Sequence, residues 1–248
     1  MIPDKYQEEY LIPLNFVDNK SRLRPSSFFD IAQELAVRGS TQLGAPDAVL
    51  HQRGLGWILL RNAIHFDALP GIEEKVTLQT WHSGVSGPLF TRDYRCLNAS
   101  GDAIIRATSS WALMDLKNRI IVKPARIFDI FPVEPQCPER ALQPDAPKII
   151  FPQNCDREEA GTHRVSYSEL DYNVHANNGR YPHWAIDCLP PEYPMNKTVR
   201  DFYLNYNHEI RLGESVQLLR AQGPDGAWYV EGFCGDIQCF ISKIVFAD

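Results

Sequence analysis

The chain has 248 residues, 44% hydrophobic and 23% charged, which allows one large or two modest globular units with a sizeable core. Its 25 basic and 31 acidic side chains leave a formal net charge of −6, which argues against nucleic acid or an anionic membrane as partner. No apolar run reaches the roughly 18 residues that a membrane-spanning helix needs. The segment from Met1 to Tyr10 lacks the pattern of a signal peptide, so we expect a cytoplasmic protein.

The first half of the chain reads as a short strand, one helix and a series of strands. Ser26 or Ser27 can cap a helix through about Arg38, whose apolar residues share one face. Segments rich in β-branched and aromatic residues follow, separated by turn residues, at 58–66, 75–81, 90–97 and 103–113. This order predicts a helix followed by a long antiparallel meander.

A proline-rich stretch then separates two halves. Between residues 125 and 160 the chain carries Pro132, Pro135, Pro138, Pro144, Pro147 and Pro152. Because each proline lacks an N–H donor and has a fixed φ, the stretch favours a linker that crosses the surface. We therefore expect an N-terminal domain at 1–124, a linker at 125–160 and a C-terminal domain at 161–248.

The second half repeats the order of the first. A helix closes at 183–189 before Pro190, and strands follow at 202–206, 215–219, 228–233 and 238–246. Setting Asp171 against Asp18 and Glu214 against Glu74 aligns the helices and the strands after them. The chain is therefore predicted to be α+β, with an antiparallel sheet curled around a central helix in each copy.

Common cofactor and metal signatures do not occur in the sequence. The six cysteines are scattered without a C-x-x-C pair, so we expect reduced thiols rather than a zinc site or disulfides. The phosphate-binding, dinucleotide, nucleophile-elbow and H-E-x-x-H patterns do not occur. We expect neither a metal nor a cofactor.

Polar residues suited to acid–base chemistry gather before the second helix. Asp171, Asn173 and His175 alternate along the chain, so an extended backbone would project them to one side. Asn177 and Asn178 are candidate N-caps, which would place the positive end of the helix beside His175 and stabilise an oxyanion there. Turn chemistry alone can also collect Asp, Asn and Gly residues.

The stretch 170–184 resembles the signature of the acyl-ACP thioesterases. The resemblance implies a tandem hotdog fold and a hydrolase that releases free fatty acid from acyl-acyl carrier protein in fatty acid biosynthesis. It also implies that Asp171, Asn173 and His175 act with Glu209 on the strand after the helix. Ile210 stands where plant members carry a cysteine, which argues against a cysteine acyl-enzyme. The absence of a transit peptide favours a bacterial member.

Comparison of the two copies predicts a single active site per chain. Lys20, Arg22 and Leu69 stand in the first copy where Asn173, His175 and Glu209 stand in the second. The first copy is thus free to provide an acyl-chain pocket, lined by Phe28, Ile31, Trp57, Ile58 and Leu60, although the same residues could simply fill its core.

A water activated by Glu209 and His175 would attack the thioester. Asp171 would orient His175 or Asn173, while Asn173 and the helix amides would stabilise the oxyanion. The expected partner is acyl carrier protein carrying an acyl-phosphopantetheine, bound by a monomer or homodimer. Candidate basic residues for meeting this acidic partner are Lys20, Arg22, Arg24, Arg38, Arg180, Lys197 and Arg200, with Arg180 foremost.

Two other functions fit the same pattern. A hotdog hydratase or dehydratase also uses a histidine and an acid near the central helix, and a non-catalytic protein could bind acyl thioesters without turnover. The sequence leaves open the acyl-chain length and the choice between acyl carrier protein and coenzyme A.

Overall fold

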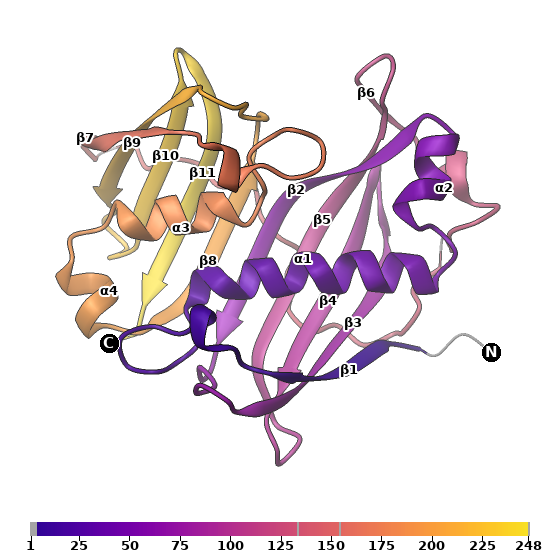
Figure 1. Ribbon diagram of the computed structural model, residues 1–248, viewed down its shortest axis with the longest axis horizontal. Helices are drawn as coiled ribbons and strands as arrows, with labels where there is room; N and C mark the ends of the chain where they lie inside the picture. Colours follow the sequence, from indigo (N-terminus) through magenta and orange to yellow (C-terminus); the bar gives the residue numbers. More distant parts are fainter. Residues whose placement is uncertain (1–3, 133, 154, 248) are drawn as a thin grey trace. The chain divides into compact units, whose positions relative to one another are not determined.

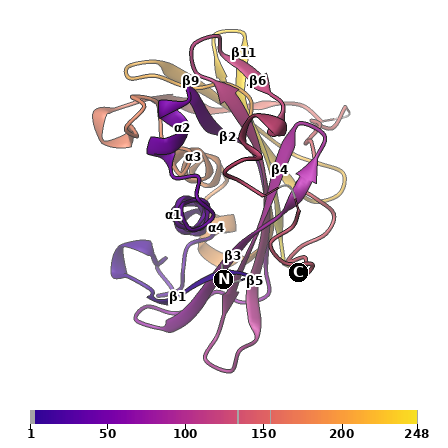
Figure 2. The same ribbon diagram turned by 90° about the vertical axis from the view of Figure 1, so that its right-hand side faces the viewer.

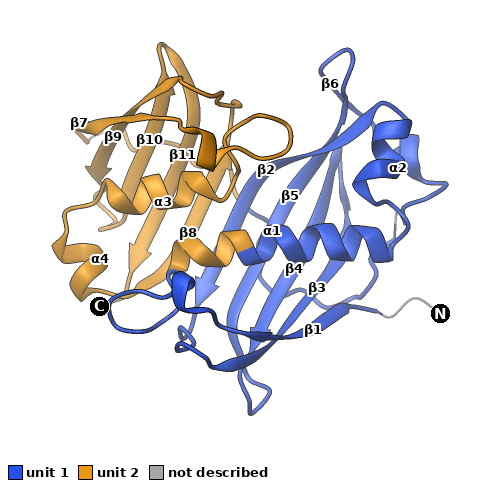
Figure 3. Cartoon of the chain, viewed as in Figure 1, with its two compact units in different colours: residues 1–24, 31–146 blue, residues 25–30, 147–248 orange. Residues whose placement is uncertain are grey.

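The computed structural model describes residues 4–132, 134–153 and 155–247. The chain forms two compact units, one made of Met1–Arg24 with Ile31–Ala146 and the other of Pro25–Asp30 with Pro147–Asp248 (Figure 3). Each unit contains a set of antiparallel strands and a helix.

The first unit contains a sheet in the order β1-β3-β4-β5-β2 (Figure 1). Its strands are β1 (Tyr6–Leu11), β2 (Leu55–Phe66), β3 (Lys75–Ser86), β4 (Leu89–Leu97), β5 (Ala103–Asp115) and β6 (Ile120–Val122), which pairs with β5. Its helices are η1 (Leu14–Phe16), α1 (Pro25–Gln42), whose first residues Pro25–Asp30 belong to the other unit, α2 (Asp47–Gln52) and η2 (Pro124–Ile127). Figure 2 looks along α1 and shows the helix lying against one face of this sheet.

Helix α1 begins earlier and ends later than the sequence predicts. Neither Ser26 nor Ser27 caps it, because Pro25 occupies the first turn after an N-cap at Arg24, which makes no side-chain capping bond. Proline suits this position since the N–H it lacks would have no helical partner. The helix extends beyond Arg38, and Gly39 leaves room for the guanidinium of Arg92 beneath it.

The second unit repeats this arrangement with the strand order β8-β11-β10-β9-β7. Its strands are β7 (Glu158–Arg164), β8 (Val199–Tyr206), β9 (Ser215–Gln222), β10 (Trp228–Cys234) and β11 (Ile237–Phe246). Its helices are η3 (Tyr167–Glu169), α3 (Arg180–Asp187) and α4 (Glu192–Asn196). Helix α3 buries Tyr181, Trp184 and Ala185 against the sheet, where Tyr181 contacts the ring of Phe240. Helix α4, which follows the two prolines after α3, was not predicted.

The loops before the two central helices match residue for residue. An antiparallel bridge joins Val17 to Leu23 in the first copy, and another joins Leu170 to Ala176 in the second. A second pair of bridges joins Arg22 to Gly71 and His175 to Arg211. The predicted α+β class, with a sheet wrapped around a helix in each of two copies, is confirmed.

The proline-rich stretch differs from the expected surface linker. Its Ile127 and Phe131 belong to the apolar core of the first unit, and Cys137 and Ala141 pack on Trp81. Farther along, Ile149 packs against the second sheet through Tyr229 and Ile241. The stretch also ends before residue 160, because β7 starts at Glu158. Apolar residues between the prolines therefore hold it against the two sheets.

Among the helices of the described residues, none combines the length and the apolar character needed to cross a membrane.

Candidate active site

His175 and Glu209 meet in the second copy. The Nε2 of His175 lies 3.4 Å from Oε2 of Glu209, and the two side chains are 21% and 29% exposed. Glu209 lies between β8 and β9, and backbone pairing brings that segment to the histidine. Ala176 donates its N–H to the carbonyl of Ile210 at 2.7 Å, and both residues are buried behind the pair. The imidazole and the carboxylate are thus partly exposed to solvent, and a backbone hydrogen bond holds together the two segments that carry them.

Asp171 shapes the loop instead of joining the pair. Its Oδ1 accepts the backbone N–H groups of Asn173 at 2.8 Å and His175 at 3.3 Å. The segment is a turn, so the expected alternation of an extended chain does not occur. Asp18 accepts the equivalent bonds from Lys20 at 2.8 Å and Arg22 at 3.0 Å in the first copy. The first copy lacks the histidine but keeps this aspartate. The aspartate therefore serves to stabilise the fold of the loop.

Asn173 lies at the tip of this turn with an exposed side chain. Its side-chain amide is therefore open to solvent. An amide N–H₂ is a donor suited to a carbonyl oxygen or to the oxyanion that forms from it.

The start of α3 offers fewer amides than expected. The N-cap is Gly179, and neither Asn177 nor Asn178 fills that position. Asn177 accepts the N–H of Gly179 through its side chain and the N–H of Arg180 through its carbonyl, both at 2.8 Å. The third residue of the helix is Pro182, which has no N–H. Most of the amide donors predicted for the oxyanion are therefore occupied or absent.

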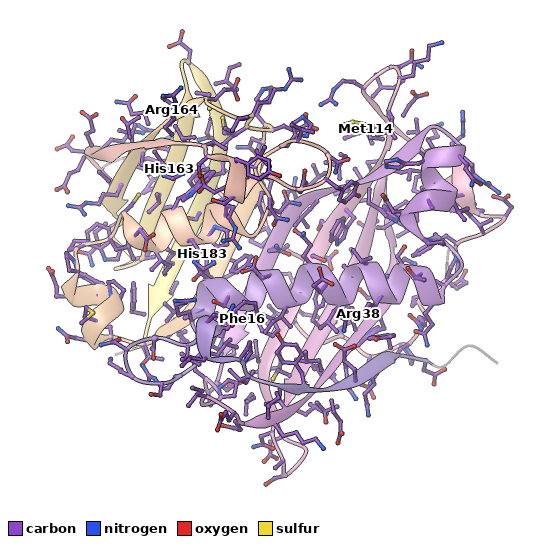
Figure 4. The ribbon with its side chains drawn as sticks, in the orientation of Figure 1. Phe16, Arg38, Met114, His163, Arg164 and His183 are labelled. Atoms are coloured by element: carbon purple, nitrogen blue, oxygen red, sulfur yellow. The ribbon has the colours of Figure 1, made fainter. Side chains whose placement is uncertain are left out.

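A carboxylate already lies at this helix end. Asp30, at the start of α1 and within the same unit, contacts Arg180 at 2.8 Å and Nε2 of His183 at 3.4 Å. A Cβ on Gly179 would come within 1.9 Å of Asp30 Oδ1, so only glycine fits beneath the carboxylate. Its negative charge complements the positive end of the helix dipole. Figure 4 labels His183 on α3.

Glu169 and His163 form a further acid–imidazole contact that the sequence analysis missed. The Nε2 of His163 lies 2.8 Å from Oε1 of Glu169, which also accepts the indole N–H of Trp184 at 3.0 Å. Ser166 donates its N–H and hydroxyl to the other oxygen at 2.8 and 2.9 Å, in a capping box. Burial raises the pKa of Glu169, but the hydrogen bonds outweigh it and hold the pKa below its ordinary value. The S-x-x-E spacing was the available signal.

The Glu169 contacts fix the two ends of the loop to each other. Its side chain binds Trp184 on α3, and its carbonyl accepts the N–H of Asn177 at 2.8 Å. The loop that carries His175 is thereby closed at its base.

Three of the six cysteine side chains are poorly suited to act as nucleophiles. Burial raises the pKa of Cys96, Cys188 and Cys239 to about 12. Ile210, which follows Glu209, is fully buried. No cluster of three or more His, Cys, Asp or Glu side chains able to hold a metal ion occurs in the described part of the chain.

Two family models match the chain. The acyl-ACP thioesterase N-terminal domain matches residues 3–129, and the acyl-ACP thioesterase C-terminal domain matches residues 153–234.

Curated relatives are plant proteins of low identity. The acyl-[acyl-carrier-protein] hydrolase FATB2, chloroplastic, of Cuphea viscosissima is 26% identical over 194 residues, covering 74% of this chain and 45% of the relative. The oleoyl-acyl carrier protein thioesterase, chloroplastic, of Coriandrum sativum is 22% identical over 241 residues, covering 89% and 63%. The chain spans about half the length of the curated relatives it matches.

Solved structures share the fold over nearly the whole chain. An acyl-ACP thioesterase from Bacteroides thetaiotaomicron VPI-5482 has a TM-score of 0.88 at 24% identity, covering 98% of both chains. The 12:0-ACP thioesterase from Umbellularia californica has a TM-score of 0.83 at 15% identity, covering 100% of this chain and 98% of the other.

Proposed function

The chain belongs to the acyl-ACP thioesterase family, and from that premise we propose that it hydrolyses acyl-acyl carrier protein to free fatty acid and carrier thiol. The observation that carries the proposal is the contact of 3.4 Å between His175 and Glu209. An imidazole beside a carboxylate at a solvent-accessible mouth can take a proton from water. We place this chemistry in fatty acid biosynthesis in the cytoplasm.

The mechanism uses one water and one pair of titratable groups. The His175–Glu209 pair takes a proton as the water oxygen bonds to the thioester carbon. The tetrahedral intermediate then collapses, the carbon–sulfur bond breaks, and the proton passes to the departing thiolate. A thiolate is a good leaving group, so activation of water and stabilisation of the oxyanion are the demanding parts.

Asp171 and Asn173 keep the parts expected of them, and the helix amides take a smaller part. Asp171 keeps the backbone of His175 in place, since its carboxylate accepts the loop amides. Asn173, which is exposed at the turn, supplies the amide for the thioester carbonyl or the oxyanion. The helix amides contribute less, because Asn177 already binds those of Gly179 and Arg180.

The two copies divide the work. Residues 161–248 carry the reacting pair, and residues 1–124 provide the pocket for the acyl chain, on either side of a connecting segment. In the first copy Arg22 stands in place of His175 and lies 3.5 Å from Asp18, so that copy offers no equivalent pair. One active site per chain follows from this division, and we propose that the protein acts as a monomer or homodimer.

The decisive experiment is a thiol-release assay with acyl-acyl carrier protein. Wild-type protein should release thiol and fatty acid together, whereas Glu209→Gln and His175→Ala should each lose about 10²- to 10⁴-fold in rate. The matched control is Arg22→Ala, which removes the counterpart of His175 in the first copy and should keep near-native turnover. Near-native turnover by Glu209→Gln would refute the assignment.

The same reaction separates the alternative functions. A hydratase or dehydratase would change the absorbance of an enoyl thioester without releasing thiol, and a binding protein would retain the thioester intact. Mass spectrometry of the released acids would define the chain-length preference.

A further inference from the structure

We propose that the rim of the His175–Glu209 site is a docking surface for the acidic carrier protein that presents the acyl group. The proposal rests on the proposed function and adds to it the residues that meet the partner. The docking rim consists of three exposed apolar residues, Tyr172, Val174 and Leu212, and two arginines, Arg164 and Arg211.

Val174 exposes its side chain from a backbone position that disfavours it. Its φ is 64°, and 61% of the residue is exposed next to His175. A β-branched residue is a rare outlier in this left-handed region, where L-residues are strained. Ser21 makes the same turn in the first copy with a φ of 58°. Because a serine forms the same turn, this backbone conformation does not require a valine. The fold alone therefore does not explain the exposed apolar side chain at this position.

Two more apolar side chains are exposed on the same loops. The bridge between His175 and Arg211 sets Leu212 beside Val174 in antiparallel register, and Leu212 is 52% exposed. Tyr172, on the same turn as Val174, is 73% exposed. The corresponding places in the first copy hold the exposed polar Asn19 and the half-buried Ile72. Exposed apolar surface gathered at one place marks an interaction site more often than scattered single residues do.

The two arginines give this rim a positive charge. Arg211 lies directly across the bridge from His175, and Arg164 on β7 donates its Nε–H to the carbonyl of Gly213 at 3.3 Å (Figure 4). Neither arginine forms an ion pair with a carboxylate within the described ranges of the chain. Their counterparts in the first copy are Gly71 and Leu11, so the fold does not require either charge.

Most of the basic residues expected to attract the carrier are neutralised. Arg22 lies 3.5 Å from Asp18, Arg180 lies 2.8 Å from Asp30, and Arg200 lies 2.9 Å from Asp201. Arg38 pairs with Glu8. A chain of net charge −6 must meet an acidic partner through a local positive surface. An apolar centre flanked by arginines is the composition typical of protein interfaces, and at this rim it complements a negative partner.

The proposal is tested by the binding of holo-acyl carrier protein, which carries no acyl group and so requires no turnover. Arg164→Gln and Arg211→Gln should each weaken binding about threefold or more, and added salt should weaken wild-type binding. The matched control is Lys117→Gln, which removes one exposed charge from the turn between β5 and β6 and should leave binding unchanged. Equal losses in Lys117→Gln and Arg164→Gln would overturn the proposal, because net charge alone would then explain them.

Val174→Ser should change the stability of the protein and its binding of the carrier in opposite directions. The serine should raise the melting temperature, because it relieves the strained valine, and should weaken carrier binding. A variant that is more stable but binds the carrier as well as wild type would refute the role of Val174.

Substrates that lack the carrier protein distinguish a defect in docking from a defect in hydrolysis. Hydrolysis of an acyl-N-acetylcysteamine thioester, which has no carrier, should be the same in wild type and Arg164→Gln. Equal defects with acyl-coenzyme A and with acyl carrier protein would assign the rim to the phosphopantetheine arm and overturn docking of the protein. If no thioester is hydrolysed, the proposed function fails, while the binding measurements still decide the docking surface.

Discussion

Asp171 and Asp18 accept the same pair of backbone hydrogen bonds in the two copies, although only Asp171 lies beside an imidazole–carboxylate pair. Asp171→Ala should therefore reduce stability by about 1–2 kcal/mol, since one exposed and one half-buried amide lose their acceptor. Asp18→Ala should cost a similar amount. Only Asp171→Ala should reduce turnover as well, because His175 loses its fixed backbone. Denaturant unfolding and thiol release, measured on both variants, check this pairing. Full activity in a destabilised Asp171→Ala would show that the turn does not position His175.

Acid should destabilise the second unit through Glu169. The folded-state pKa of Glu169 lies below its ordinary value, so its contribution is fully present above about pH 4.3 and is lost as the pH falls through the folded pKa. Glu169→Gln should lower the free energy of unfolding by about 1 kcal/mol at pH 7 and by less in acid. Unfolding curves of both proteins between pH 7 and pH 3 test this. A constant difference across that range would contradict the assignment.

Thiol reagents should leave activity intact. A pKa of about 12 at Cys96, Cys188 and Cys239 leaves a thiolate fraction on the order of 10⁻⁴ at pH 8. The partly exposed Cys155 should react first with a maleimide. Mass spectrometry of the labelled residues, together with the activity of the labelled protein, gives the comparison. Rapid inactivation coupled to labelling of Cys239 would point to a reactive thiol near the site.

Asp93 should be the strongest single anchor of the proline-rich stretch. This fully buried carboxylate accepts bonds from Arg140 at 2.9 Å and from the N–H of Ala141 at 2.7 Å. Asp93→Ala should cost about 3–5 kcal/mol, because it leaves Arg140 without its buried partner. Asp145→Ala removes the other, 42% exposed partner of Arg140 and should cost less than about 1 kcal/mol. Chemical denaturation and limited proteolysis around residue 140 distinguish the two variants, and equal losses would refute the prediction.

The architecture could be predicted from the sequence, because the patterns that indicate helices and strands are local and occur in both copies. Each copy has one amphipathic helix followed by β-rich segments, and the correspondences of Asp18 with Asp171 and of Glu74 with Glu214 reappear as equal hydrogen bonds. Glu74 and Glu214 accept the N–H groups of Gly71 and Arg211 at 2.8 and 2.7 Å. Helix starts were less predictable, since Arg24 and Gly179 occupy the N-cap positions assigned to serine and asparagine.

The details of the site depended on contacts between distant residues. Side-chain spacing alone could not show that Asp171 turns toward its own backbone or that Asp30, far along the chain, meets α3. The proline-rich stretch was misjudged because the prolines mask the apolar residues between them, which pack on Trp81 and Tyr229. The sequence indicates Glu169 only as part of a capping box, and its spacing does not predict the contact with His163.

The bridge between Arg22 and Gly71 gives the first copy the same backbone frame that holds His175 opposite Arg211. Grafting an imidazole and a carboxylate onto that frame, by Arg22→His with Leu69→Glu, would rebuild the acid–base couple at a site that has the turn but lacks the groups. If the proposed chemistry belongs to the second copy alone, the first copy retains an empty backbone frame on which a second reaction could be engineered.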